Sequence, residues 1–270
     1  MKRAVRIGTI VKILTDSPGK LFPLQYFCDL FGVAKSSISE DIILADESTV
    51  AAHSGRIITI AGAAGGVKFI PAIDKEECRK VQDDICKRIT DESRILGGGF
   101  LYTSDIMFDM SLAIKLSRIF ATKFSDINAD YVATVETKGI PLAAMVAHQL
   151  NLPLIVIRRE AKFSDGSTVS INYFSGSYDR VQKMSLAKRA VVPGSKAIAI
   201  DDFMRGGGSS KGIADILSEF DIELVATGIA IVAREPEKKK IDNFVPIIYL
   251  DYVDEENKVI KVSPNDNLFD

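Results

Sequence analysis

The stretch AIAIDDFMRGGGSSKG, Ala197 to Gly212, predicts a strand, a loop and a helix in direct succession. Its apolar start, Ala197–Ile200, is typical of a short buried strand in a parallel sheet. Two acids, Asp201 and Asp202, follow at the carboxyl end of that strand, and the glycines Gly206–Gly208 lead into a helix. The helix has one apolar face, on which residues recur at spacings of three and four: Ile213, Ile216, Leu217 and Phe220.

This succession suits a sugar phosphate as ligand. Glycines let the backbone approach an anion closely, and the N–H groups at a helix start donate toward it. Carboxylates accept hydrogen bonds from neighbouring hydroxyls or hold a divalent cation. The loop is not a P-loop, because Ser210 precedes Lys211, and it is not a dinucleotide fingerprint, because Asp201 and Asp202 separate strand from glycines. The plain alternative is a strand-to-helix turn without a ligand.

A strand, two acids and a Gly-Gly-Ser loop resemble the ribose-5-phosphate signature of type I phosphoribosyltransferases. Members of that family bind phosphoribosyl pyrophosphate (PRPP) with Mg²⁺. The resemblance therefore implies a PRPP site to which the metal comes with the ligand, so that the protein alone needs no metal and no obligatory cofactor. The residues expected to bind from this stretch are Asp201, Asp202, Phe203, Met204, Arg205, Gly206, Gly207, Gly208 and Ser209.

From about Phe100 onward, strands alternate with helices, which predicts an α/β domain whose largely parallel sheet is flanked by helices. Strands are expected at Tyr131–Val135 and Leu154–Ile157, with a helix at Leu142–Leu150 between them. Because ligands of such sheets bind at the carboxyl ends of the strands, the residues after each strand are candidates for the site. These are Thr137, Lys138 and Gly139, as a second anion loop for pyrophosphate, and Arg158 and Arg159.

The polar segment Ala161–Arg189 interrupts this alternation. Asp165-Gly166 predicts the turn of a hairpin, and Lys162 is one of several cations expected to face an anionic ligand. Type I transferases carry a flexible hood loop at this point of the chain, so the resemblance implies a hood here. A solvated hairpin without ligand contact is the alternative.

Residues 1–73 predict a small separate domain. Apolar residues at helical spacing indicate helices at Ala4–Leu14 and Leu24–Phe31. A third helix is expected in Lys35–Ile42, where either Ser36 or Ser37 has the position of the N-cap. Two helices joined through a glycine-containing turn fit a helix-turn-helix.

The hairpin expected after these helices, from Arg56–Ile60 and Val67–Ile70, fits a wing. Cations at the first helix, the third helix and the wing favour double-stranded DNA as partner, because they would contact phosphates. A generic three-helix packing module has the same periodicity and is the alternative. The residues predicted to contact DNA are Lys2, Arg3, Arg6, Lys35, Ser36, Ser37, Ser39, Arg56 and Lys68.

The overall composition adds few constraints. The 270 residues carry a formal charge of −2, so bulk charge does not indicate a polyanionic partner. Three cysteines without a C-x-x-C pair are typical of free thiols in a reducing cytoplasm, and neither a membrane span nor a signal peptide is evident. Segment 74–92 is expected to be a charged linker helix that opens a second domain, 74–270. Its narrow apolar stripe would dock on its own domain or on another subunit.

Taken whole, the chain resembles the bacterial purine operon repressor family, whose members join an N-terminal winged helix to a C-terminal phosphoribosyltransferase-like domain. The resemblance covers nearly the entire chain. It implies a cytoplasmic repressor of purine biosynthesis genes that binds PRPP in a non-catalytic pocket as inducer. Guanosine tetraphosphate is the expected competitor for that pocket. Paired operator half-sites would need paired winged helices, so a homodimer is expected.

Arg205 departs from the enzymes, which usually have a small residue at this place, and so favours loss of catalysis. A cation and an aromatic ring beside a phosphate loop suit a purine nucleotide, with Phe203 or Tyr102 stacked on its base. The alternative function is a purine salvage phosphoribosyltransferase with an accessory helical domain. Within Arg234–Asp270 no residue stands out as the nucleobase hood that such an enzyme needs.

Overall fold

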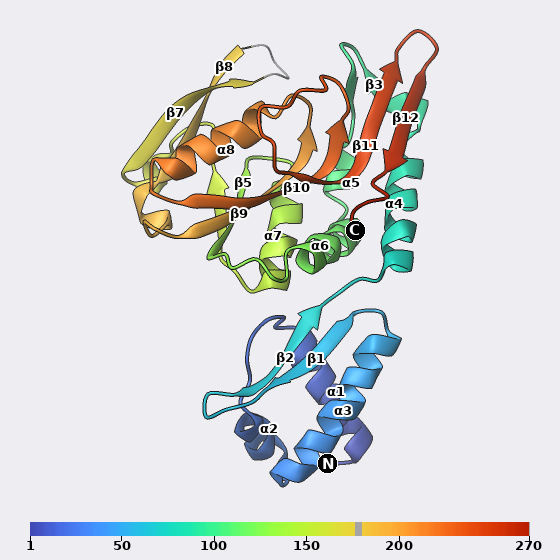
Figure 1. Ribbon diagram of the computed structural model, residues 1–270, viewed down its shortest axis with the longest axis vertical. Coiled ribbons are helices and arrows are strands. Elements are labelled where there is room, and N and C mark those ends of the chain that lie inside the picture. Colours follow the sequence, from blue (N-terminus) through green and yellow to red (C-terminus); the bar gives the residue numbers. More distant parts are fainter. Residues whose placement is uncertain (176–179, 270) are drawn as a thin grey trace.

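The computed structural model describes residues 1–175 and 180–269, arranged as a small N-terminal part and a larger part built on a sheet (Figure 1). The N-terminal part has three helices and a two-stranded antiparallel sheet. Its core is formed by the apolar faces of all three helices with the inner face of the hairpin, among them Ile10, Leu14, Phe27, Ile38 and Val67. The elements are α1 (Arg3–Thr15), α2 (Leu24–Phe31), α3 (Lys35–Ala51), β1 (Gly55–Ile60) and β2 (Gly66–Pro71).

The predicted helices and wing are confirmed, but the predicted cap of the third helix is wrong. Helix α3 begins at Lys35, its N-cap residue is Ala34, and no side chain caps it. Ser36 and Ser37 lie inside the first turn, where their own N–H groups are among those that a cap would satisfy. Both seryl residues therefore belong to the start of the helix.

The linker helix α4 (Lys75–Ile89) docks on its own chain. Its N-cap is Asp74, whose side chain accepts a hydrogen bond from the Glu77 amide at 2.8 Å. Its apolar stripe, from Cys78 to Ile89, is buried in the main core, and α4 stands beside β11 and β12 (Figure 1). The helix ends at Ile89 and is followed by a 3₁₀ turn (Glu92–Arg94), the short strands β3 (Ile95–Leu96) and β4 (Phe100–Leu101), and α5 (Ser104–Met107).

The larger part is a six-stranded sheet in the order β12-β11-β10-β9-β5-β6, in which only β12 is antiparallel to its neighbour. Helices α4, α6 and α7 cover one face and α8 covers the other, together with a hairpin of β7 and β8. The mostly parallel sheet is thus confirmed. Its elements are α6 (Met110–Lys123), β5 (Tyr131–Val135), α7 (Ile140–Leu150), β6 (Leu154–Ile157), β7 (Thr168–Ser175), β8 (Arg180–Ala187), β9 (Lys196–Met204), α8 (Gly208–Ser218), β10 (Glu223–Ala233), β11 (Val245–Asp254) and β12 (Val259–Pro264).

Strand β9 is longer than the four apolar residues predicted. It continues through both acids to Met204, because β10 runs parallel beside it up to the pair Met204 and Val232. Met204 is buried against Ile229 and Val232. The acids therefore belong to the carboxyl end of the strand and are fixed by the hydrogen bonds of the sheet.

The insert forms a hairpin, but its predicted turn is wrong. Asp165 and Gly166 precede β7 and close a 3₁₀ turn (Phe163–Asp165), where the Asp165 carboxylate accepts from the Lys162 amide at 3.2 Å and lies 3.3 Å from Arg158. The hairpin packs on α8, and β8 also reaches the edge of the main sheet. There Arg158 and Ser185 exchange two backbone hydrogen bonds, of 3.0 and 2.7 Å. In the part of the chain described, no helix has the length and apolar character to cross a membrane.

Candidate functional site

A cavity of about 440 Å³ opens at the carboxyl ends of β5 and β9. It lies where the sequence predicts a ligand, between two strand ends of a parallel sheet. Residues from four regions line it: the β3–β4 hairpin with the residues after it, the end of β5 with the following loop, the residues after β6, and the end of β9 with the glycine loop. The lining residues are Gly99, Phe100, Leu101, Thr103, Val135, Glu136, Thr137, Lys138, Arg159, Asp201, Asp202, Phe203, Arg205 and Ser209.

Two adjacent acids at the end of β9 line this cavity. Asp201 is only 5% exposed, and its Oδ1 accepts a hydrogen bond from the Asp202 amide at 2.9 Å. Burial raises the pKa of Asp201 well above its ordinary value, and the adjacent charge of Asp202 raises it further. Burial also raises the pKa of Asp202, against the attraction of Lys138. The hydrogen bonds and nearby cations therefore do not fully offset the burial of this pair, and ligand hydroxyls or a cation would stabilise its charge further.

The loop after β5 touches these acids directly. A Cβ on Gly139 would lie 2.7 Å from Asp201 Oδ1 and equally close to Thr134 Oγ1, so only glycine fits there. Thr137 and Lys138 precede it and line the cavity, and the Glu136–Thr137 peptide is cis. The backbone of the predicted pyrophosphate loop is thus held against the predicted ribose acids.

The glycine loop leads straight into α8, as the sequence predicts. Gly207 is the N-cap residue, with a φ of +78°, and Ser209 in the first turn lines the cavity. The loop is supported from behind by residues 234–244, a segment in which the sequence indicated no role. The Lys240 amide donates to the Gly206 oxygen at 3.0 Å.

Lys239 holds that supporting segment in shape. Its ammonium group donates to the backbone oxygens of Ala233, Arg234 and Pro236, at 2.6, 3.2 and 2.5 Å. Burial lowers the pKa of Lys239, and the charge of Glu235 opposes that change. Sequence reasoning missed this residue because nothing local distinguishes it from its neighbours in a run of lysines.

A further wall of the cavity was also missed. Gly99 and Phe100 of the β3–β4 hairpin line it, and the sequence predicted neither as a site residue. The Arg205 guanidinium lies over the Phe100 ring, 5.7 Å from its centroid. The glycine run Gly97–Gly99 marks the hairpin, but its position beside Arg205 depends on tertiary packing.

Eight predicted ligand residues lie outside the lining of this cavity. Four of them are glycines of the two loops beside it, Gly139, Gly206, Gly207 and Gly208, and the other four are Arg158, Lys162, Met204 and Tyr102. Arg158 is engaged by Asp165, at 3.3 Å, and lies 4.0 Å from Glu136. Lys162 is exposed on the 3₁₀ turn, and Met204 is buried in the core. Tyr102 does not line the cavity, although its neighbours Leu101 and Thr103 do, and it is 48% exposed. Eight predicted residues do lie together in the lining: Asp201, Asp202, Phe203, Arg205, Ser209, Thr137, Lys138 and Arg159.

The predicted DNA-contacting residues divide into two groups. Three arginines are held by carboxylates: Arg3 by Asp41 at 2.9 Å and Glu40 at 3.2 Å, Arg6 by Asp41, and Arg56 by Asp46 at 2.8 Å. Arg6 is buried, so it is not free to contact phosphate. The remaining residues lie at the start of α1, at the start of α3 and on the wing, and all but Ser37 and Lys68 are exposed: Lys2, Lys35, Ser36, Ser37, Ser39 and Lys68.

Asp41 explains why these arginines are occupied. It is fully buried, and an isolated carboxylate at that depth would be costly. Burial works to raise its pKa, but hydrogen bonds from Arg6 and Arg3 lower it overall. The two arginines thus serve the fold of the N-terminal part.

Comparison with known proteins gives a family for each part. Residues 2–71 match the family described as "Bacterial purine repressor, N-terminal", and residues 105–266 match the "Phosphoribosyl transferase domain". A Bacillus subtilis protein named "Purine biosynthesis transcriptional repressor PurR" is 37% identical over 97% of this chain and 92% of its own. A Lactococcus lactis protein named "Purine biosynthesis transcriptional activator PurR" is 36% identical over 97% of both chains.

The transferases among the similar proteins cover little more than half of the chain. A xanthine phosphoribosyltransferase of Oenococcus oeni is 29% identical over 55% of this chain and 74% of its own. Among solved structures, adenine phosphoribosyltransferase of Thermoanaerobacter pseudethanolicus superposes on 62% of this chain and 98% of its own, with a TM-score of 0.53 at 17% identity. At that identity the superposition shows the phosphoribosyltransferase fold alone.

Proposed function

Because the chain belongs to the PurR family of purine biosynthesis transcriptional regulators, we propose that it represses purine biosynthesis genes and that PRPP releases it from the operator. One observation carries this proposal. A winged helix-turn-helix shares a chain with a cavity in which two buried acids with raised pKa values lie beside two loops suited to anions. Such a chain can couple DNA binding to a phosphorylated sugar.

PRPP fits the distribution of charge in the cavity. Its ribose hydroxyls donate to Asp201 and Asp202, and its 5-phosphate accepts from the glycine loop and the start of α8. Its pyrophosphate is held by the loop Thr137–Gly139 with Arg159 at the rim. Mg²⁺ comes with PRPP, and the raised pKa values of the acids make its positive charge favourable there.

Guanosine tetraphosphate is the proposed competitor. Its phosphates need the same two loops, so both ligands exclude each other. Phe203, Phe100 and the Arg205 guanidinium form the apolar and cationic wall on which a purine ring can stack. Competition is tested by displacing bound PRPP with guanosine tetraphosphate in an equilibrium titration.

The proposed function includes no transferase activity. Arg205 stands where the enzymes usually carry a small residue, and it lies against the wall formed by Phe100. The alternative, a purine salvage transferase, is favoured by the relatives of the larger part named xanthine phosphoribosyltransferase. Release of pyrophosphate from PRPP in the presence of adenine, guanine, hypoxanthine or xanthine would establish that alternative.

The proposed DNA surface is the exposed start of α3 with the wing. Lys35, Ser36 and Ser39 are exposed there, Lys2 extends the surface from α1, and Lys68 lies on β2. Lysines would contact phosphates, and serines would reach phosphates or base edges. Arg3, Arg6 and Arg56 are left out, because carboxylates hold them.

The proposed assembly is a homodimer. Large apolar side chains remain 38–49% exposed along one short stretch of the effector part: Leu96, Phe100, Tyr102, Phe108, Met110 and Ile114. A second copy is one partner that would cover them. Light scattering gives the assembly mass, and Phe108→Asp is expected to lower it to that of one chain.

The first test is binding to duplex DNA from upstream of purine biosynthesis genes, followed by fluorescence anisotropy across a Mg²⁺·PRPP titration. Repression with PRPP as inducer predicts an affinity that falls as PRPP saturates, typically about 5–150-fold. An affinity that rises would favour activation of the kind that the Lactococcus lactis names state. An unchanged affinity would rule out PRPP as the effector.

A further inference from the structure

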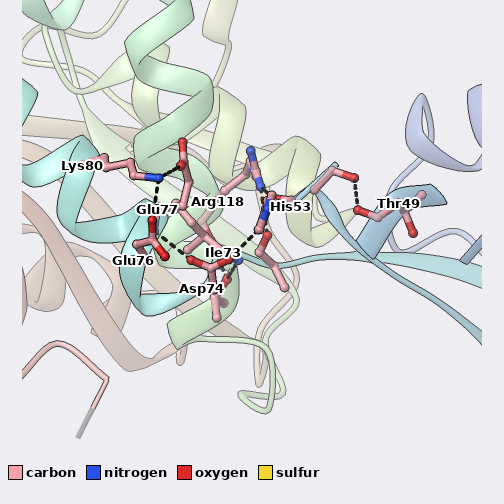
Figure 2. A network of polar contacts seen from close by, with 11 residues as sticks. Thr49, His53, Ile73, Asp74, Glu76, Glu77, Lys80 and Arg118 are labelled. Atoms are coloured by element: carbon pink, nitrogen blue, oxygen red, sulfur yellow. Dashed lines mark hydrogen bonds and ion pairs between the residues drawn. The ribbon is translucent and has the colours of Figure 1, made fainter. Parts of the chain in front are cut away.

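Helix α6 holds the N-terminal part through its last turns (Figure 2). Arg118 donates through Nη2 to the backbone oxygens of His53 and Ala72, the second at 3.1 Å. One turn later, Thr122 Oγ1 accepts a hydrogen bond from the Ile73 amide at 3.0 Å. His53 precedes β1 and Ala72 follows β2, so one guanidinium joins both ends of the wing.

The other end of α6 connects to the cavity. Thr103 lines the cavity, and its backbone oxygen accepts the N–H groups of Ile106 and Met107 that open α5. Asp109 then caps α6. Along its length α6 packs on α7, which begins directly after the loop Thr137–Gly139. Both the hairpin wall and the pyrophosphate loop therefore reach α6.

The hydrogen-bond donors of Arg118 are only partly satisfied. Its Nε is buried and finds no acceptor among the residues that the structure describes. Burial lowers the pKa of Arg118, while the charges of Glu77 and Asp74 on the facing end of α4 work to raise it. The Asp74 carboxylate already contacts His53, at 2.8 Å, and accepts a hydrogen bond from the amide of Glu77. The Glu77 carboxylate has Lys80 at 3.6 Å, so it is the nearby acid with most capacity left.

Resting on the function proposed above, we infer that Arg118 is a latch with two positions. Bonded to His53 and Ala72, it holds the wing in the orientation that binds DNA. Turned to Glu77, it satisfies its remaining donor with a charged partner and frees the wing. A ligand in the cavity shifts this equilibrium through α6, to the extent that it binds the second state more tightly.

The test compares Arg118→Met with Lys115→Met. Lys115 is an exposed cation one turn away on α6, and within residues 1–175 and 180–269 no hydrogen bond or ion pair joins it to the N-terminal part. In each full-length variant, PRPP affinity is measured by calorimetry and DNA affinity with and without saturating Mg²⁺·PRPP. We expect Arg118→Met to bind PRPP within about twofold of the parent, while the effect of PRPP on DNA affinity disappears. Lys115→Met keeps the full effect. An undiminished effect in Arg118→Met would overturn the latch.

Glu77→Gln adds a result of opposite sign. Removing the competing carboxylate favours the position in which Arg118 is bonded to His53 and Ala72. The DNA affinity of Glu77→Gln should therefore stay high when PRPP is added, whereas Arg118→Met should have a lower DNA affinity even without PRPP. Equal starting affinities in the two variants would contradict the second position.

Hydrogen exchange separates failure of the latch from failure of the proposed function. Without any effector, the Ile73 amide should exchange faster in Arg118→Met than in Lys115→Met, because the contact that fixes the end of β2 is lost. If the parent does not respond to PRPP, the proposed function fails, and the latch is then judged by this exchange alone. Unchanged exchange at Ile73 would overturn it as well.

Discussion

Two buried aspartates show how differently the two parts of this chain use charge. Asp41 in the N-terminal part is fully buried, and Arg3 and Arg6 lower its pKa. Asp201 in the larger part is 5% exposed, and burial with the charge of Asp202 raises its pKa. The partners of Asp41 more than offset its burial, whereas those of Asp201 do not. Burial alone therefore does not indicate a binding site, but burial that raises the pKa of an acid in a cavity does.

The largest effect is expected at Asp41. Asp41→Ala leaves Arg6 buried without its carboxylate, and breaking such a pair typically costs about 3–5 kcal/mol. Urea unfolding followed on the N-terminal part measures this loss. Glu40→Ala is the matched control, because Glu40 is exposed and pairs only with Arg3, so it should cost less than about 1 kcal/mol. Equal losses would remove the distinction between paired and surface acids.

The next largest effect is expected at Asp201, where the same substitution should raise the stability of the fold and weaken ligand binding. Its raised pKa means that the folded chain holds this proton more tightly than the unfolded chain does. The stability that the proton confers is complete below the ordinary carboxyl pKa and is lost as pH rises toward the folded-state pKa. At neutral pH, Asp201→Asn should therefore raise the unfolding temperature by roughly 2–4 °C, the shift that about 1 kcal/mol produces in a domain of this size.

The same Asp201→Asn variant should have a lower affinity for PRPP. Hydrogen bonds to a charged group contribute about 1.5–3 kcal/mol, which corresponds to roughly 10–150-fold in affinity. Calorimetry with Mg²⁺·PRPP measures this, and unchanged DNA affinity without PRPP is the control. A variant that is less stable and binds PRPP normally would mean that Asp201 resembles Asp41.

A smaller loss is expected at Lys239, which supports the glycine loop without lining the cavity. Lys239→Met removes three hydrogen bonds to backbone oxygens, and PRPP affinity should fall about tenfold. Lys238→Met, next to it on an exposed position, should leave affinity unchanged. If both variants bind alike, the segment 234–244 does not shape the phosphate site.

The smallest effect is expected on the DNA surface. Lys35→Ala should weaken DNA binding a few-fold and lower the slope of log affinity against log salt by about one contact. Arg56→Ala is the comparison, because Arg56 pairs with Asp46 in the free protein and should leave the slope unchanged. A reduced slope for Arg56→Ala would show that Arg56 contacts DNA phosphates and belongs to the DNA surface.

Local signals in the sequence predicted much of this fold. Tyr131–Val135 and Leu154–Ile157 are strands with the predicted bounds, and Gly32 ends α2 as expected, because apolar runs and glycines act over short distances. The end of β9 was missed because Asp201 and Asp202 are polar, and only pairing with β10 keeps them in the strand.

The acids and both anion loops of the candidate site could also be predicted, because each follows a strand directly. Phe100 and Lys239 could not, since they reach the site from elements distant in the sequence. The occupation of Arg6 was equally hidden, because a helical pattern does not reveal that Asp41 faces it across the core.

The position of the β7–β8 hairpin at the sheet edge has a consequence for how this segment can be studied. Through Arg158 and Ser185 it covers the free edge of β6, and exposed edge strands pair readily with other chains. Deleting the hairpin would therefore uncover a template for aggregation, and loss of PRPP binding in such a deletion would report on solubility. Point substitutions that keep the pairing of β8 with β6 are the way to examine this segment.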